Sequence, residues 1–142
     1  MRVAVLSDIH SNAPALEAAL AAVGEFDQLW VLGDIVGYGP HPNEVVERLR
    51  ELDAVAVQGN HDAAVLGRIP TGTFNDLARA AVEWTAKTIS AANLDWLAEL
   101  PETRVEGDFT LAHGSPRDPI WEYLFSVPAA RINLAAFETP YC

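Results

Sequence analysis

Three stretches of the sequence decide the fold: VAVLSDIHSN at residues 3–12, QLWVLGDIVG at residues 28–37 and VAVQGNHD at residues 55–62. Each contains a short apolar run rich in β-branched residues, which is typical of strands buried in a parallel sheet. The segments between them have helical periodicity, and each opens with a proline, Pro14 or Pro42. The order strand, helix, strand, helix, strand predicts a parallel sheet with right-handed crossovers.

The two intervening helices are expected to pack on the sheet through one apolar face each. Their apolar residues recur at helical spacing: Leu16, Ala19, Leu20 and Val23 in the first, and Val45, Val46, Leu49 and Leu52 in the second. Gly24 is expected to end the first helix. The first 60 residues therefore predict an α/β fold.

The second half of the chain predicts further helices and a hairpin. A helix from Phe74 to about Thr88 would bury Leu77, Ala80, Ala81 and Trp84. Ser90 is a candidate N-cap for a helix from about Ala91 to Leu100, which Pro101 ends. Val105 and the run 109–112 predict two strands across the turn 106–108, and a last helix is expected from Pro128 to about Phe137. We expect residues 1–142 to form a single domain.

The composition excludes several classes of protein. The chain has 142 residues, half of them hydrophobic, which excludes a disordered or collagen-like chain. Lys and Arg number 9 against 20 Asp and Glu, a net charge of −11, so general nucleic-acid binding through a basic patch is not expected. The one cysteine, Cys142, excludes an intrachain disulfide and a cysteine-based zinc site. No signal peptide or membrane span is predicted, and a cytoplasmic location is expected.

Polar residues follow the strands, at 7–12, 33–37, 59–62 and 113–114. Ligands of an open parallel sheet bind beyond the carboxyl ends of its strands. The side chains in these loops that could bind a metal ion or transfer a proton are those of Asp8, His10, Asp34, Asn60, His61 and His113. Taken singly, each has an ordinary explanation as a capping, turn or surface residue. Four such clusters, each directly after a strand, instead favour a common site at one rim.

The residue types in these loops suit metal ions. Carboxylate, imidazole and carboxamide groups without a thiolate favour Mn²⁺, Fe, Zn²⁺, Co²⁺ or Ni²⁺ over Ca²⁺ or a structural zinc. One central aspartate can bridge two cations. Two divalent cations would leave the pocket positive despite Asp8 and Asp34, and would thus supply the phosphate affinity that an acidic protein lacks. A water bound to such a metal has a pKa lowered to roughly 7–9, which makes it a nucleophile near neutral pH.

These motifs resemble those of a known family. Asp8-X-His10, Gly33-Asp34, Gly59-Asn60-His61-Asp62 and His113 are similar to the first four sequence blocks of the calcineurin-like metallophosphoesterase superfamily. The segments 7–12 and 33–43 most resemble its small prokaryotic phosphodiesterase-like branch. The resemblance runs from residue 3 to residue 115 in the expected order. It implies an α/β fold in which a β-sandwich is flanked by helices.

The resemblance also implies a role for each residue. Asp8 and His10 would hold a first metal, Asp34 would bridge two metals, and Asn60 and His113 would hold the second. His61 would act as the general acid on the leaving group and would not bind metal. A hydroxide held by the metal pair would then attack phosphorus in line. The substrate would be a small phosphoester or nucleotide-like molecule.

One block of the family is missing. The family has a Gly-His-X-His block that gives one histidine to each metal, and no histidine occurs among the 29 residues after His113. We therefore expect this chain to be a truncated form with an incomplete second sheet. The missing block leaves open a non-catalytic binding or scaffold module that keeps the fold. A nucleotide-binding βαβ protein is disfavoured, because the first turn has no glycine and hence no G-x-G-x-x-G cradle.

Other residues permit two interpretations each. Asp62 either orients His61 or interacts with a helix N-terminus as a carboxylate. Arg117 is the best basic candidate for a substrate phosphate, although a solvated loop arginine is the simpler interpretation. Trp121 lines a pocket or fills the core, and Trp84 fits a helix core face. His41 is expected at the surface or the edge of a substrate site rather than as a ligand.

Overall fold

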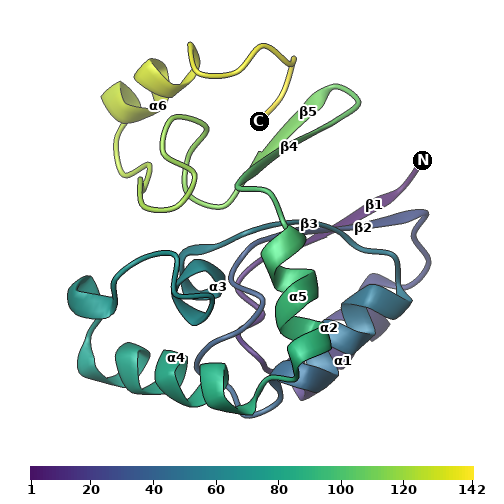
Figure 1. Cartoon of the computed structure of the whole chain (residues 1–142). Helices are drawn as coiled ribbons and strands as arrows, with labels where there is room; N and C mark the ends of the chain where they lie inside the picture. Colours follow the sequence, from purple (N-terminus) through teal and green to yellow (C-terminus); the bar gives the residue numbers. More distant parts are fainter.

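The computed structural model describes all residues, 1–142 (Figure 1). The first half alternates strands and helices: β1 (Val3–Leu6), α1 (Ala13–Val23), β2 (Gln28–Leu32), α2 (Pro42–Glu51), β3 (Val55–Val57) and α3 (Asn60–Val65). The strands have the bounds that the sequence predicts. Asn12 caps α1 by accepting a hydrogen bond from the backbone N–H of Ala15, and Gly24 ends it with φ of 72°.

The three strands form a parallel sheet in the order β1-β2-β3. Val3 pairs with Gln28 and Leu6 with Val31, while Trp30 pairs with Val55. Since all three strands run in the same direction, their carboxyl ends lie at one edge, and the loops that follow them leave from that edge. The predicted parallel α/β arrangement is confirmed.

The second half adds helices and a hairpin: the short 3₁₀ helix η1 (Thr71–Thr73), α4 (Asp76–Thr88), α5 (Ala91–Glu99), β4 (Thr103–Glu106), β5 (Phe109–Ala112) and α6 (Val127–Asn133). Strands β4 and β5 are antiparallel, as predicted. Ser90 caps α5 through its side chain. Helix α6 is shorter than the sequence predicts, because the chain turns at Ala135 and Ala136 with short-range hydrogen bonds to Ile132 and Asn133.

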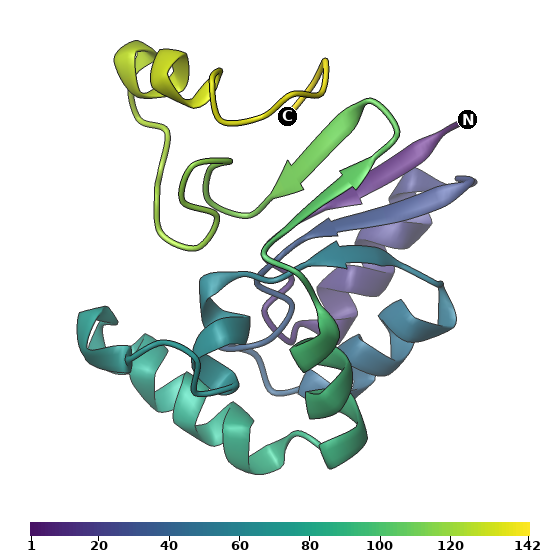
Figure 2. The ribbon, with the colours of Figure 1, turned by 45° about the horizontal axis from the view of Figure 1, so that its top comes forward.

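Helices pack on one face of the parallel sheet and the hairpin on part of the other, where Val5 of β1 stays half exposed (Figure 2). Leu29 and Val31 of β2 belong to the main core, which also contains apolar residues of α1, α2 and α5. The intervening Trp30 turns to the opposite face, where it forms a second, smaller core with Val57 and Leu111 of β5. The hairpin β4–β5 is thus the small second sheet of a sandwich with helices outside, as the sequence analysis expects.

The predicted buried face of α4 is wrong. Leu77 and Trp84 are exposed, at 72% and 44%, and the buried side chains are Ala78, Val82 and Thr85. Helix α4 packs beside α3. Its buried residues are small, which permits close approach of two helices, whereas the bulky side chains lie outside. Of the other two residues predicted to be buried, Ala80 is exposed and Ala81 is half-buried, so the buried face of α4 is rotated from the predicted one.

The end of the chain lies beside the hairpin. Tyr141 forms a parallel bridge with Phe109. Its backbone N–H donates to Asp108 at 3.1 Å, and its carbonyl accepts from Thr110 at 2.9 Å. Tyr141 therefore adds a single bridge to the edge of the second sheet. None of the helices is long and apolar enough to cross a membrane.

Candidate functional site

The loops after β1, β2 and β3 are joined by backbone hydrogen bonds. The N–H of Asp8 donates to the carbonyl of Gly33 at 3.1 Å, and the N–H of His10 donates to that of Asp34 at 2.9 Å. The N–H of His61, at the start of α3, donates to Asp34 Oδ1 at 2.9 Å. These bonds hold the polar clusters together at the carboxyl edge of the sheet, as their positions after the strands predict.

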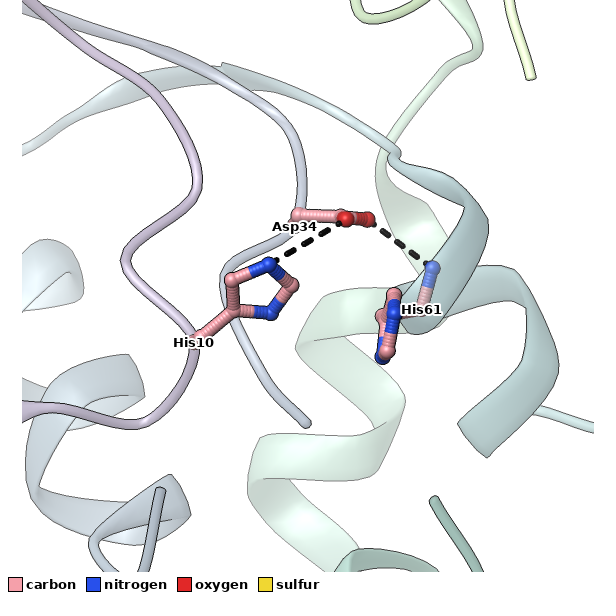
Figure 3. Close-up of side chains that lie close together, drawn as sticks. All are labelled: His10, Asp34 and His61. Atoms are coloured by element: carbon pink, nitrogen blue, oxygen red, sulfur yellow. Dashed lines mark hydrogen bonds and ion pairs between the residues drawn. The ribbon is translucent and has the colours of Figure 1, made fainter. Parts of the chain in front are cut away.

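Asp34 lies at the centre of the cluster. Its Oδ2 is 3.5 Å from His10 Nε2 and 3.6 Å from His113 Nε2. His10 Nε2 also lies 3.7 Å from Asp8 Oδ1. Figure 3 shows His10 and His61 on either side of the Asp34 carboxylate, the first from the loop after β1 and the second from the start of α3. The buried Asp34 thus has donor groups on two sides.

Hydrogen bonds fix the orientation of the His10 and His113 rings. His113 Nδ1 lies 2.8 Å from the carbonyl of Leu32, which leaves Nε2 facing Asp34 and 3.1 Å from Asn60 Oδ1. His10 Nδ1 lies 3.2 Å from the carbonyl of Val36, which leaves its Nε2 facing Asp34 as well. Histidines that bind metal usually have their second ring nitrogen held in this way.

Two sets of donor atoms lie close enough to share an ion. Asp8, Asp34 and His113 form one set, and His10, Asp34 and His61 form the other, with the donor atoms of each set within 4.8 Å of one another. Asp34 belongs to both sets, as a bridging ligand would. Of the residues nominated from the sequence, all six lie in this cluster, with Asn60 joined through His113.

The electrostatics of the cluster favour a bound cation. Burial, together with the nearby carboxylates of Asp62 and Asp8, raises the pKa of Asp34 from 3.8 to about 8, despite the hydrogen bond from His61. No lysine or arginine pairs with Asp34. A buried carboxylate of this kind gains stability from a positive ion beside it. The oxygen and nitrogen donors present suit a divalent transition metal, so the residues fit the ions that the sequence motifs imply.

His61 is buried and packed among rings. Its centroid is 4.7 Å from that of His10 and 4.9 Å from that of Phe74. Burial, and then the neighbouring His10 and His113, lower the pKa of His61 to about 4, so its ring is neutral at pH 7. His61 Nδ1 is buried without a hydrogen-bond partner.

Gly37 makes room for the His61 ring. A Cβ atom on Gly37 would lie 2.6 Å from His61 Nδ1, and its φ of +95° is one that side chains rarely adopt. Only glycine fits at this position without moving the imidazole.

Asp62 joins two of the loops that carry the site. Its carboxylate is fully buried and accepts hydrogen bonds from the N–H of Val36 at 3.0 Å and of Gly59 at 2.9 Å. Burial raises its pKa, and these hydrogen bonds act in the opposite direction. Neither bond reaches the His61 ring. Asp62 therefore does not orient the His61 ring but interacts with the N-terminus of α3. Its hydrogen bond with Val36 also joins α3 to the loop after β2.

Backbone strain concentrates in the same loops. Asp8, His10, Ser11, Asp34 and Tyr38 all have φ between 45° and 56°, although none is glycine. Such conformations cost on the order of 1 kcal/mol each, and they cluster at functional sites.

Other residues nominated from the sequence lie elsewhere. Arg117 pairs with the Glu122 carboxylate through Nη2 and Nε. This favours its interpretation as a loop arginine over that as a ligand of a substrate phosphate. His41 stands at the N-cap position of α2 without a side-chain capping hydrogen bond, and it belongs to neither set of ligand atoms. Trp121 is 37% exposed and contacts Phe74 rather than filling the core.

Two aromatic neighbours of the site were missed. Tyr38 and Phe74 both contact His61. The signal for Tyr38 is an aromatic residue between two glycines, Gly37 and Gly39, in a loop directly after a strand. Phe74 has no comparable signal.

With this geometry in view, comparison with known proteins gives the family. The family model for calcineurin-like phosphoesterases matches residues 1–137, and the chain therefore belongs to that family. It is 45% identical over 130 residues to the uncharacterized protein MJ0912 of Methanocaldococcus jannaschii, covering 87% of this chain and 54% of that protein. It is 32% identical over 93 residues to a symmetrical bis(5′-nucleosyl)-tetraphosphatase of Aromatoleum aromaticum, covering 61% of this chain and 33% of that enzyme.

A solved structure supports the same assignment. The crystal structure of a metallophosphoesterase from Sphaerobacter thermophilus is 48% identical and matches with a TM-score of 0.87. The match covers 99% of this chain and 58% of the other. The chain thus spans about half the length of MJ0912 and of the Sphaerobacter protein, and a third of the tetraphosphatase.

Proposed function

We propose that this protein hydrolyses phosphomonoesters or phosphodiesters of small, nucleotide-like molecules, using two divalent cations and a hydroxide. The observation that carries the proposal is the position of Asp34 between His10 and His113, at 3.5 and 3.6 Å. Family membership supports phosphoester chemistry. The relative named as a bis(5′-nucleosyl)-tetraphosphatase supports a nucleotide-like substrate.

In this proposal Asp8 and His10 hold one cation, Asn60 and His113 hold the other, and Asp34 is shared between them. This pairing is the one that the family resemblance implies, and it differs from the two sets of donor atoms above, which group Asp8 with His113 and His10 with His61. The distances within each pair support it: His10 Nε2 lies 3.7 Å from Asp8 Oδ1, and His113 Nε2 lies 3.1 Å from Asn60 Oδ1. Mn²⁺, Fe, Zn²⁺, Co²⁺ and Ni²⁺ all suit these donors. When bound, the cation pair would supply positive charge for the phosphoryl oxygens and lower the pKa of a water to give the hydroxide nucleophile. The carbonyls of Val36 and Leu32 keep the two histidine rings in place.

His61 is proposed as the general acid. Its ring lies beside His10 but is held by α3, so it can face a substrate bound at the cluster. A neutral imidazole carries one N–H, which donates to an oxygen of the substrate. The negative charge of a bound phosphoester acts against burial and raises the pKa of His61, so that the ring takes up a second proton, which it can give to the leaving group before returning to the neutral form.

Two variants test the metal ligands and the acid separately. Asp34→Asn is expected to lose hydrolysis and most of the bound Mn²⁺ together, measured by turnover and by elemental mass spectrometry. Asp76→Asn, on the exposed face of α4, is the matched control and is expected to keep both. Turnover retained by Asp34→Asn with full metal content would contradict the shared-ligand role.

His61→Ala is expected to slow hydrolysis of alkyl phosphoesters, which have poor leaving groups, far more than that of p-nitrophenyl esters. The reason is that only a poor leaving group needs a proton from the enzyme. An equal loss on both substrates would contradict the general-acid role.

A further inference from the structure

Three aromatic side chains from separate segments line one side of the candidate site. Tyr38 follows β2, Phe74 follows η1, and Trp121 lies in the loop after β5. Tyr38 and Phe74 contact His61, with centroids 4.7 and 4.9 Å apart. Trp121 contacts Phe74 edge to face at 5.6 Å. These three residues, which we name the aromatic shelf, lead from the proposed general acid toward solvent.

Phe74 packs against the main core, but the other two shelf residues do not serve as hydrophobic core. Tyr38 is 44% exposed and Trp121 is 37% exposed, and both lie outside the two apolar core clusters. Tyr38 also has a left-handed φ of 45°. An exposed aromatic ring on strained backbone gains little from burial, so its position beside His61 calls for another explanation.

We propose that the aromatic shelf binds the planar base of a nucleotide substrate by stacking; this inference rests on the proposed function. Bases of every type stack on aromatic side chains. The base of a nucleoside phosphate is one sugar away from the phosphorus, and the shelf adjoins the ligand cluster, since the ring centroids of Tyr38 and His10 are 4.9 Å apart.

The charge of the chain favours this occupant. The net charge is −11, and Arg117, the basic residue near the site in sequence, is paired with Glu122. Recognition of a substrate by additional basic side chains is therefore disfavoured. With the phosphoryl group held by cations, contact with a neutral aromatic ring is the recognition that these residues offer.

The test compares ligands that share a phosphate but differ in the base. Mn²⁺-loaded chain is titrated with 5′-AMP and with ribose 5-phosphate, and the dissociation constants are measured by calorimetry. Since stacking of a base contributes about 1–3 kcal/mol, 5′-AMP is expected to bind about 5- to 150-fold more tightly. Trp121→Leu is expected to weaken the binding of 5′-AMP by most of that factor and to leave the dissociation constant of ribose 5-phosphate unchanged. Trp121→Phe is expected to keep most of the preference for 5′-AMP.

Tyr123→Leu is the matched control. Tyr123 is an exposed aromatic residue that stacks on Phe125, at 5.4 Å, away from the shelf. The substitution is expected to change neither dissociation constant. Thermal unfolding of each variant verifies that the fold is retained.

A second measurement separates the shelf from the metal site. In metal-free protein, adenosine alone is expected to shift the NMR signal of the Trp121 indole N–H, identified by its loss in Trp121→Phe. If ribose 5-phosphate shows no Mn²⁺-dependent binding while adenosine shifts this signal, the proposed function fails and the shelf stands. If 5′-AMP and ribose 5-phosphate bind equally, or Trp121→Leu weakens both by one factor, the shelf proposal is wrong. A dimer that forms through the shelf and disappears in Trp121→Leu would also overturn it.

Discussion

Replacing Asp62 by alanine is expected to destabilise the fold strongly. The substitution removes the acceptor for two buried backbone N–H groups, those of Val36 and Gly59, at 3.0 and 2.9 Å. Leaving a buried donor unpaired costs about 1–3 kcal/mol. The expected loss of unfolding free energy is therefore about 2–6 kcal/mol, a large part of the roughly 5–15 kcal/mol that holds a domain folded.

Asp62→Asn is the milder variant, because one carboxamide oxygen still accepts. It is expected to cost about 1–3 kcal/mol. Urea unfolding followed by tryptophan fluorescence measures both values. Because Asp62 joins the loop that carries Asp34 to the start of α3, which carries Asn60, we also expect Asp62→Asn to weaken Mn²⁺ binding about tenfold.

Asp118→Ala is the matched control for this prediction. Asp118 also accepts from two backbone N–H groups, those of Ile120 and Trp121, but it is exposed. Water can replace its carboxylate, so the expected loss is about 0.5 kcal/mol or less. If Asp62→Ala and Asp118→Ala destabilised the protein equally, the argument from buried donors would be refuted.

Three further predictions concern the site and its surroundings. Gly37→Ala is expected to displace the His61 ring, because the new Cβ would lie 2.6 Å from Nδ1; a large change in the NMR shifts of His61, absent from Gly72→Ala with its open surroundings, measures this. In metal-free protein the raised pKa of Asp34, about 8 against 3.8, means that the folded state holds a proton which the unfolded state has lost between these values. Unfolding free energy is thus expected to fall as pH rises from about 6.5 to about 8, above the range from about 4 to 6.5 in which the lowered pKa of His61 acts in the opposite direction. Loss of this fall in Asp34→Asn, with the fall kept in Asp76→Asn, checks the assignment. Hydrogen bonds from Ser115, Arg117 and Asn133 lower the pKa of Glu122 from 4.5 to about 2, so their stabilising effect is present above pH 4.5 and lost as pH falls toward 2. Hydrogen exchange in residues 115–133 is expected to accelerate over that range, and an unchanged acid profile in Glu122→Gln would contradict this cause.

The position of the site followed from the sequence because it depends on topology. Asp8, Asp34 and Asn60 each lie two or three residues after the end of a strand. Parallel strands bring such residues to one edge of the sheet, whatever the details of side-chain packing. The central position of Asp34 was implied only by the family resemblance, because its distances to His10 and His113 depend on loop backbones with positive φ.

Features that depend on side-chain packing were not predictable in the same way. The face of α4 was misassigned because small Ala78 and Val82 pack inward while Trp84 lies outside. The ion pair of Arg117 with Glu122 could not be predicted, because it depends on the path of the loop after β5. The aromatic shelf joins residues 38, 74 and 121, and no local pattern links positions so far apart.

The central claim is that Asp34 is shared by two cations. Anomalous diffraction from crystals of this chain grown with Mn²⁺ tests it most directly. We expect two manganese peaks flanking the Asp34 carboxylate, one next to Asp8 and His10 and the other next to Asn60 and His113. Manganese bound elsewhere, or no peak within bonding distance of Asp34, would contradict it.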